Sequence, residues 1–353
     1  GMGVELEDLK ALRTEGALTP GHPEFGHTPG VELTTGPLGT GLASAVGFAM
    51  AERFTHGLLD PDTPHGQSIF DHCVYVIAGD GCLQEGVSAE ASSLAGTQKL
   101  GNLIVLWDDN RISIEGDTDI AFSEDVLKRY ESYGWHVQRV DWLSEDGSYV
   151  EDVHALDEAL DAARDHTDQP SIIALRTIIG WPTPEKSNTG GIHGAKLGEE
   201  ALRGLKLELG ADPDAHFAVD EEAVAHSRKQ FAQRAQTLRD QWDQRFKQWE
   251  EANPERAALL KRLRQGELPA GWEKALPEFP AEKAIATRSA SGKVLNAIAP
   301  VLPELWGGSA DLGGSNNTFL NGLASFLPEG TYSRSFKADP YGRNLPFGIR
   351  EFA

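Results

Sequence analysis

The chain has 353 residues, of which 40% are hydrophobic, and its formal net charge is −22. This length is enough for about two domains, and no apolar run approaches the ~18 residues of a membrane span. The acidic balance argues against binding to nucleic acid through a basic surface. Two cysteines, Cys73 and Cys82, are too few for a disulfide framework. Because the first residues also lack an export signal, we expect a cytoplasmic protein with no membrane partner.

The first sixty residues predict two helices and a long connection. Residues 5–13 could form a short amphipathic helix, and residues 42–54 form an apolar helix rich in small side chains. Before the second helix, residues 34–41 contain three glycines, which allow close backbone approach, and the free amides of a helix start suit a phosphate. A tightly packed turn into a helix explains this segment equally well.

Two apolar runs rich in β-branched residues form the centre of the pattern, at residues 74–81 and 103–110. Each predicts a buried strand, and residues 84–100 between them predict a helix, which makes a βαβ unit. Asp80 and Asn110 follow the two strands, and open α/β sheets bind their ligands at the carboxyl ends of the strands. We therefore interpret this edge as a cofactor site with one ion. A simple strand-end turn is the alternative reading of Asp80.

The alternation of strands and helices continues to about residue 200. The pattern predicts a helix at 123–133 capped by Ser123, a strand at 135–140, a helix at 150–165 and a strand at 171–179. This order indicates an α/β fold with a doubly wound, mostly parallel sheet. The loop that follows carries His193, and a lone loop histidine is usually only solvated.

A charged, glycine-poor region then separates two α/β segments. Residues 219–253 predict a long surface helix, which 255–265 continue after Pro254. From residue 287 a helix runs to about 299, and a strand at 305–311 leads into a glycine-rich loop suited to an anion. One helix and one strand cannot close a core at domain scale, so we expect an incomplete second domain.

The motifs, taken together, resemble the transketolase family. Gly79-Asp80-Gly81 followed by Asn110 resembles the thiamin diphosphate motif. The other segments that resemble the family occur in its order: 19–24 (TPGHPE), 34–39 (TTGPLG), 133–137 (YGWHV), 177–180 (TIIG), 308–312 (GSADL) and 348–352 (GIREF), where Ile349 is a mild departure. The resemblance implies a thiamin diphosphate-binding fold. Its domains would be a diphosphate-binding domain at 1–205, a helical linker at 206–282 and the beginning of a pyrimidine-binding domain at 283–353.

The family transfers a two-carbon ketol unit from a ketose phosphate to an aldose phosphate in the pentose phosphate pathway. The resemblance implies thiamin diphosphate and Mg²⁺, with Ca²⁺ as a substitute, and a homodimer with sites between subunits. Segments at both ends of the family sequence are absent, so we expect the chain to be inactive alone. The alternatives are a related thiamin enzyme, such as a deoxyxylulose phosphate synthase, and a non-catalytic subunit.

Residue by residue, the resemblance implies three groups of site residues. Asp80, Asn110 and the backbone carbonyl of Ile112 would hold the metal, and oxygen ligands of this kind suit Mg²⁺. The residues that would bind the cofactor are Gly36, Pro37, Leu38, Gly81, Asn110, His193 and Asp311.

The third group acts on the substrate. Glu351, His193 and His22 would be catalytic, and Glu351 would donate a hydrogen bond to the aminopyrimidine ring, which implies a buried, protonated carboxyl. Arg288 and Ser315, with both histidines, would hold the sugar phosphate, since arginine offers a forked donor to phosphate. Without the resemblance, Arg288 would be a surface residue at a helix start and Ser315 a turn residue.

Overall fold

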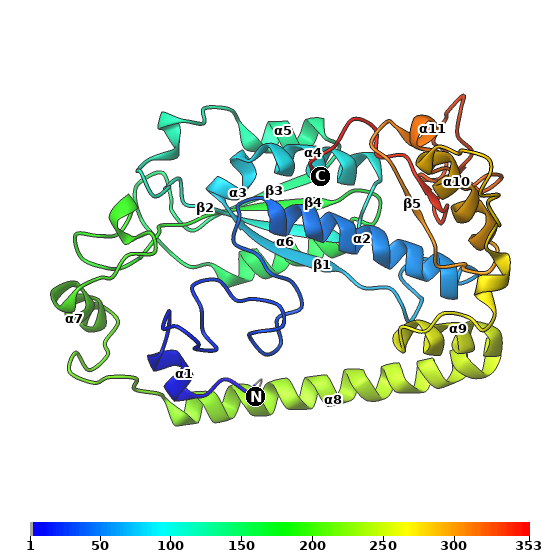
Figure 1. Ribbon diagram of the computed structural model, residues 1–353. Helices are drawn as coiled ribbons and strands as arrows, with labels where there is room; N and C mark the ends of the chain where they lie inside the picture. The colour runs from blue at the N-terminus through cyan, green and yellow to red at the C-terminus, as the bar shows by residue number, and fades with distance from the viewer. Residues whose placement is uncertain (1–2) are drawn as a thin grey trace.

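The structure is a computed structural model that describes residues 3–353. Its main sheet has four strands, β1 (Val74–Gly79), β2 (Leu103–Asp109), β3 (His136–Asp141) and β4 (Ser171–Arg176), in the order β1-β2-β4-β3 (Figure 1). Every neighbouring pair is parallel. The predicted parallel α/β sheet is therefore confirmed, and the carboxyl ends of β1 and β2 lie side by side.

Helices cover both faces of this sheet. On one face lie α2 (Thr40–Leu59), α4 (Gly86–Thr97) and α5 (Val126–Ser132), whose apolar side chains share a core with β1, β2 and β4. On the other face α6 (Val153–Asp165) packs Ala159 and Ala163 against Ile104 and Ile173. Small residues on the helices let their backbones approach the β-branched surface closely. The doubly wound arrangement is confirmed.

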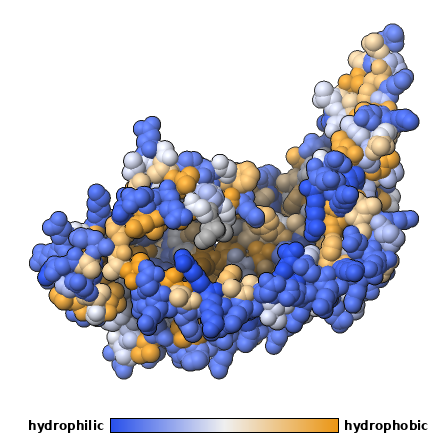
Figure 2. Space-filling view, turned by 90° about the horizontal axis from the view of Figure 1, so that it is seen from below, coloured by the Kyte–Doolittle hydropathy of each residue, from blue (hydrophilic) through white to orange (hydrophobic). Residues whose placement is uncertain are grey.

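The prediction that both central strands are buried is correct for β2 and wrong for β1. β2 is buried along most of its length, whereas Tyr75 and Ile77 of β1 are 48% and 83% exposed. β1 is an edge strand, and α6 packs on β3 and β4 instead. Seen from below, the molecule is hollowed, and apolar residues gather inside the hollow behind a hydrophilic rim (Figure 2).

Two helix predictions need correction at their starts. The helix expected at 84–100 is α4, which begins at Gly86, and the sequence pattern did not predict the short helix α3 (Asp80–Gln84) that follows β1 directly and is separated from α4 by the extended Glu85. Ser123 does not cap α5. Asp125 does so instead, by accepting a hydrogen bond from the Lys128 amide at 3.2 Å. An aspartate caps as well as a serine, and here it stands next to the first helical residue.

The long helix predicted at 219–253 is confirmed as α8 (Glu221–Ala252), which runs along one side of the molecule (Figure 1). Trp242 fixes it to the body by donating its indole N–H to the carbonyl of Ile69 at 3.0 Å. The other helices of this part and of the first segment are α1 (Leu6–Lys10), η1 (Thr118–Ile120), η2 (Gly190–Ile192), α7 (Glu199–Glu208), α9 (Pro254–Arg264) and η3 (Trp272–Ala275). The domain boundary expected at 205/206 falls inside α7, a helix that the sequence pattern did not predict. None of the described helices is both long and apolar enough to cross a membrane.

The second segment has more structure than the predicted helix and strand. It contains α10 (Thr287–Ile298), β5 (Gly307–Gly308), α11 (Gly313–Asn316), β6 (Ser325–Phe326), β7 (Ala338–Asp339) and β8 (Asn344–Leu345). The strands form a second parallel sheet in the order β5-β8-β6-β7. The strand expected at 305–311 has only two residues, and the expected loop at 312–317 holds the single turn of α11. Two-residue strands are too short to leave a periodic pattern in the sequence.

The two α/β segments share a core. Phe54 of α2 stacks on Trp306, with ring centroids 4.4 Å apart. The Arg53 guanidinium lies 4.1 Å from the ring centroid of the fully buried Phe326. Gln98 completes the contact by accepting from Arg53 and donating to the Phe326 carbonyl at 3.0 Å. The second segment is thus anchored on α2 and on the end of α4.

Candidate cofactor and metal site

Asp80 and Asn110 lie at the carboxyl ends of neighbouring parallel strands. In the β1–β2 register Gly79 pairs with Asp108, so Asp80 begins α3 beside the loop that carries Asn110. The Asp80 carboxylate accepts from the Arg111 amide at 3.0 Å and from the Trp107 indole at 3.3 Å. The structure therefore brings Asp80 into direct contact with the residue next to Asn110.

Asn110 and Ile112 form the other half of this site. The Asn110 side-chain oxygen accepts from the Ile112 amide at 2.9 Å, and its amide group donates to Asp108 at 3.0 Å. All of Asp80, Asn110 and Ile112 are buried. The three residues expected to hold a metal thus lie together, where β1 ends and the loop after β2 begins. Their surroundings are rich in oxygen atoms.

The charges around Asp80 favour a cation. Burial, followed by the Asp109 and Asp108 carboxylates, raises the pKa of Asp80 to about 6, against the lowering effect of its hydrogen-bond donors. Among the described residues Asp80 forms no ion pair, because Arg111 and Arg139 pair with Asp109, at 3.6 and 3.5 Å. A cavity of about 340 Å³ opens beside Asp80. A hard divalent cation fits this donor set, since it prefers carboxylate and carbonyl oxygens.

The glycine-rich segment before α2 lies against the same strand end. Leu38 covers Gly81 so closely that a Cβ atom there would be 3.0 Å from the Leu38 Cδ1. The His22 ring packs on Gly36 in the same way, at 3.2 Å. The structure therefore brings together Leu38 with Gly81 and His22 with Gly36, and Pro37 lies between them in the chain. Glycine at 81 leaves room for the loop to approach.

His193 and Asp311 are the other two residues expected to bind the cofactor. His193 follows η2 and is exposed, but its loop packs on the loop after Ile112, since a Cβ at Gly190 would lie 2.8 Å from the Ile114 carbonyl. Asp311 is exposed, with a φ of 55°, directly before α11. Within residues 3–353 neither side chain forms a hydrogen bond or an ion pair with Asp80.

Arg288 and Ser315 lie on two helices that touch. Arg288 is exposed in the first turn of α10, and Ser315 is exposed in α11, where its hydroxyl donates to the Leu312 carbonyl at 3.2 Å. α10 and α11 meet where a Cβ at Gly292 would lie 2.7 Å from Asn317. In the described part of the chain the Arg288 guanidinium has no hydrogen-bond or ion-pair partner.

Glu351 is exposed, and among the described residues no hydrogen bond or ion pair joins it to Asp80. Its neighbours hold the segment on α4: Arg350 donates to the Ser93 hydroxyl at 3.0 Å, and the Phe352 amide donates to Glu90 at 3.1 Å. The expectation of a buried Glu351 is therefore not met by this chain, because no other part of residues 3–353 covers the carboxyl. Only a surface outside these residues could bury it.

Three residues for which the sequence motifs predict no role shape the Asp80 site. Trp107 donates to Asp80, Asp108 orients Asn110, and Asp109 holds Arg111 and Arg139 at its side. Asp108 is itself held by the Thr177 hydroxyl at the end of β4. The signal was present, since two aspartates stand directly before Asn110 at a strand end.

Comparison with known proteins identifies the family. Residues 1–269 match the family model "Transketolase, thiamine diphosphate binding domain", and residues 283–353 match "Transketolase, pyrimidine binding domain". The chain belongs to the transketolase family. Both matched descriptions agree with the resemblance inferred from the motifs.

Similar transketolases cover the whole chain. It is 54% identical to a transketolase of Mycobacterium leprae over 354 residues and 46% identical to one of Geobacillus stearothermophilus, covering 100% of this chain and 50% of each relative. A crystal structure of a transketolase complex with sedoheptulose-7-phosphate from Pichia stipitis matches with a TM-score of 0.89 and 43% identity, over 99% of this chain and 50% of that one. A transketolase structure from Leishmania mexicana matches with a TM-score of 0.88 and 39% identity, over 99% and 49% of the two chains. The chain thus spans about half the length of these relatives.

Proposed function

We propose that the chain is part of an enzyme with transketolase activity. The reaction would move a two-carbon ketol unit from a ketose phosphate to an aldose phosphate, in the pentose phosphate pathway of the cytoplasm. In this proposal residues 1–205 form the diphosphate-binding domain, 206–282 the helical linker and 283–353 the beginning of the pyrimidine-binding domain. Membership of the transketolase family supports the reaction class.

The observation that carries the proposal is the buried Asp80 carboxylate without a basic partner, in contact with the loop of Asn110. We infer that Asp80, Asn110 and the Ile112 carbonyl bind Mg²⁺, for which Ca²⁺ could substitute. Gly36, Pro37, Leu38, Gly81, Asn110, His193 and Asp311 would bind thiamin diphosphate. The close packing of Leu38 on Gly81 supports a cofactor bound between the loop and the strand end.

Thiamin diphosphate, when bound, supplies the electron sink for cleavage of the ketose carbon–carbon bond. The chain's own residues would bind and orient the sugar. Arg288 and Ser315, exposed on two touching helices, would hold the phosphate group. His22 and His193 would contact the substrate near the cofactor. Crystal structures of similar transketolases with sedoheptulose-7-phosphate and xylulose-5-phosphate support sugar phosphates as the substrate class.

Glu351 would donate a hydrogen bond to the pyrimidine ring of the cofactor. Its exposed carboxyl supports a role at a site completed by another subunit. We therefore propose a homodimer with sites between subunits. A partner surface over Glu351 would supply the burial that keeps its carboxyl protonated.

Two measurements on the full-length protein test this proposal. Thiamin diphosphate with Mg²⁺ should raise the melting temperature, because a ligand that binds only the folded state stabilises it. Xylulose 5-phosphate and ribose 5-phosphate should then give sedoheptulose 7-phosphate. The absence of any thermal shift would refute the cofactor assignment. A thermal shift without turnover would instead favour a non-catalytic subunit.

A further inference from the structure

A second cluster of possible metal ligands is buried far along α2 from the Asp80 site. Glu52 and His56 stand one helical turn apart on α2, and Asp71 faces them from the loop before β1. One ligand atom from each side chain lies within 4.8 Å of the others. Glu52 is 2% exposed and His56 is fully buried. Nothing in the proposed transketolase site uses these residues.

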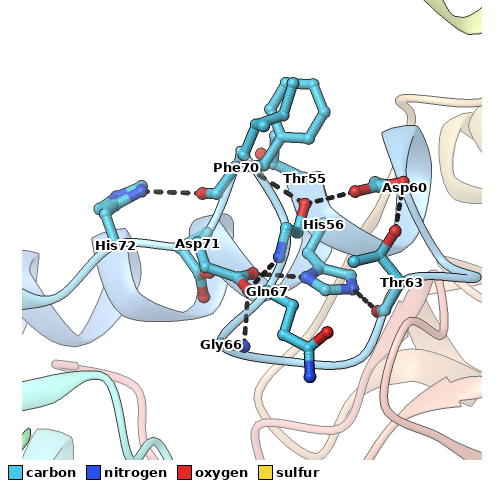
Figure 3. Close-up of polar contacts among 12 residues, drawn as sticks. Thr55, His56, Asp60, Thr63, Gly66, Gln67, Phe70, Asp71 and His72 are labelled. Carbon is cyan, nitrogen blue, oxygen red and sulfur yellow. Dashed lines mark hydrogen bonds and ion pairs between the residues drawn. The ribbon is translucent and has the colours of Figure 1, made fainter. Parts of the chain in front are cut away.

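Each side chain is oriented by a hydrogen bond to a group outside the cluster, so that another of its atoms faces the other ligands. The His56 Nε2 lies 2.9 Å from the Thr63 carbonyl, a contact that requires N–H at Nε2 (Figure 3). One Asp71 oxygen accepts from the amides of Gly66 and Ser68, at 2.6 and 2.9 Å. In metal sites, ligating histidines and carboxylates are oriented by such outer hydrogen bonds. The His56 Nδ1 and the other Asp71 oxygen are thus left facing each other, 2.5 Å apart.

Glu52 completes the pattern. Its Oε2 accepts from the Asn102 side-chain amide at 2.9 Å, while its Oε1 has no hydrogen-bond partner among the described residues. A buried carboxylate oxygen without a partner is costly unless something positive satisfies it. This orphaned oxygen points to an occupant that the protein atoms do not provide.

We propose that Glu52, His56 and Asp71 bind a divalent transition-metal ion, with Zn²⁺ as the expected occupant. One imidazole nitrogen and two carboxylate oxygens suit zinc, whereas Mg²⁺ and Ca²⁺ take oxygen ligands alone. A water molecule would complete the tetrahedral set.

Binding requires the three ligand atoms, which lie within 4.8 Å of one another, to adjust their separations. With zinc–ligand distances of about 2.0–2.1 Å, two ligands of a tetrahedral site are about 3.3 Å apart. The 2.5 Å contact between His56 and Asp71 must therefore open by less than ~1 Å. Without the metal, a proton occupies this contact and pairs the two side chains. Zinc and the proton then compete for the His56 Nδ1.

The proposed metal ion would have a structural role. Its ligands join α2 to the loop of residues 60–72, and α8 packs on this loop through Trp242 and through Trp249, whose ring lies 4.9 Å from Phe70. Tyr341 of the second segment stacks on His56 at 5.5 Å. A metal ion bound at this point would stabilise the packing of α2 against α8 and against the second segment.

Zinc titration of the metal-stripped protein tests the proposal, with excess Mg²⁺ present to occupy the oxygen-rich Asp80 site. We expect one equivalent of Zn²⁺ to bind and to raise the melting temperature. Glu52→Gln should weaken this binding by at least about 10- to 100-fold, since it removes an anionic ligand. Glu251→Gln, the same change at an exposed position of α8, should leave it unchanged.

Anomalous diffraction at the zinc edge provides a readout that does not depend on a variant that folds. Wild-type crystals soaked in Zn²⁺ should show a peak between Glu52, His56 and Asp71. Zinc binding that Glu52→Gln leaves intact, or the absence of that peak, would overturn the proposal and leave a proton as the occupant. Neither outcome bears on the Asp80 site, so this test is independent of the proposed activity.

Discussion

The Asp80 carboxylate accepts a hydrogen bond from the backbone amide of Arg111 at 3.0 Å, which joins the end of β1 to the loop after β2. This contact joins two segments that the chain separates by 31 residues, and it leaves the carboxylate buried with no basic partner among the described residues. A buried carboxylate needs a positive charge nearby, and a bound cation would supply it here. The proposed metal site therefore rests on charge and burial as well as on the motif.

Asp80→Asn should abolish stabilisation by thiamin diphosphate and Mg²⁺. The asparagine side chain keeps an oxygen for the Arg111 amide but loses the charge that attracts the cation. With ligand at about 100 times its Kd, the wild type should gain about 2.7 kcal/mol, and the variant should gain almost none. Thermal unfolding with and without the ligands measures the difference. Asp168→Asn, an exposed position, is the control, and a full ligand response in Asp80→Asn would exclude Asp80 as a ligand.

Gly39→Ala should destabilise the protein by about 1–3 kcal/mol. Gly39 has a φ of 80°, and an added Cβ would lie 2.7 Å from the Ser88 hydroxyl and 2.9 Å from Val87. Urea unfolding measures the change. The matched control is Gly47→Ala inside α2, where nothing lies within 4 Å. That change should be neutral or stabilising by up to about 1 kcal/mol, because alanine favours the helix. Equal effects at both positions would contradict the argument.

Gln98→Met should cost about 2–3 kcal/mol by leaving buried polar groups without partners. The Gln98 side chain is 1% exposed, accepts from Arg53 and donates to the Phe326 carbonyl. Because the contact joins the two α/β segments, we expect them to unfold less cooperatively in the variant. Denaturant unfolding followed by two spectroscopic probes would detect this. Gln236→Met on exposed α8 removes only a surface contact and should cost less than about 0.5 kcal/mol.

The Arg262–Glu304 pair should make stability depend on acid pH. Partial burial alone would raise the pKa of Glu304, but its hydrogen bond and ion pair with Arg262 outweigh burial and hold the pKa below its usual value. Both guanidinium–carboxylate distances are 2.8 Å. A lowered pKa means that the stabilisation is complete above the unfolded-state pKa of 4.5 and disappears as the pH falls through the folded value.

Glu304→Gln should therefore reduce stability by about 1 kcal/mol at pH 7 and by less at pH 3. Unfolding measured across this range tests the sign. A difference between wild type and variant that grows toward low pH would contradict the assignment.

The Glu52–His56–Asp71 cluster and the exposure of Glu351 show where sequence reasoning reaches its limit. His56 and Asp71 are 15 residues apart, and Glu52 and Asn102 are 50 apart. Neither separation matches the period of a helix or a strand, so the sequence pattern does not mark these residues as partners. Likewise, nothing in the residues around Glu351 reveals that their contacts would be with α4, 262 residues earlier in the chain.

The sequence alone determined the order of strands and helices in the first segment, the parallel sheet, the long helix α8 and the position of Asp80 and Asn110 at neighbouring strand ends. These features follow from local periodicity and from the rule that a βαβ connection makes its strands parallel. Tertiary structure alone decided that β1 is an edge strand with an exposed face, that Asp125 caps α5 and that the second segment shares a core with α2. Burial and capping depend on which distant surfaces meet, and this depends on packing over the whole chain.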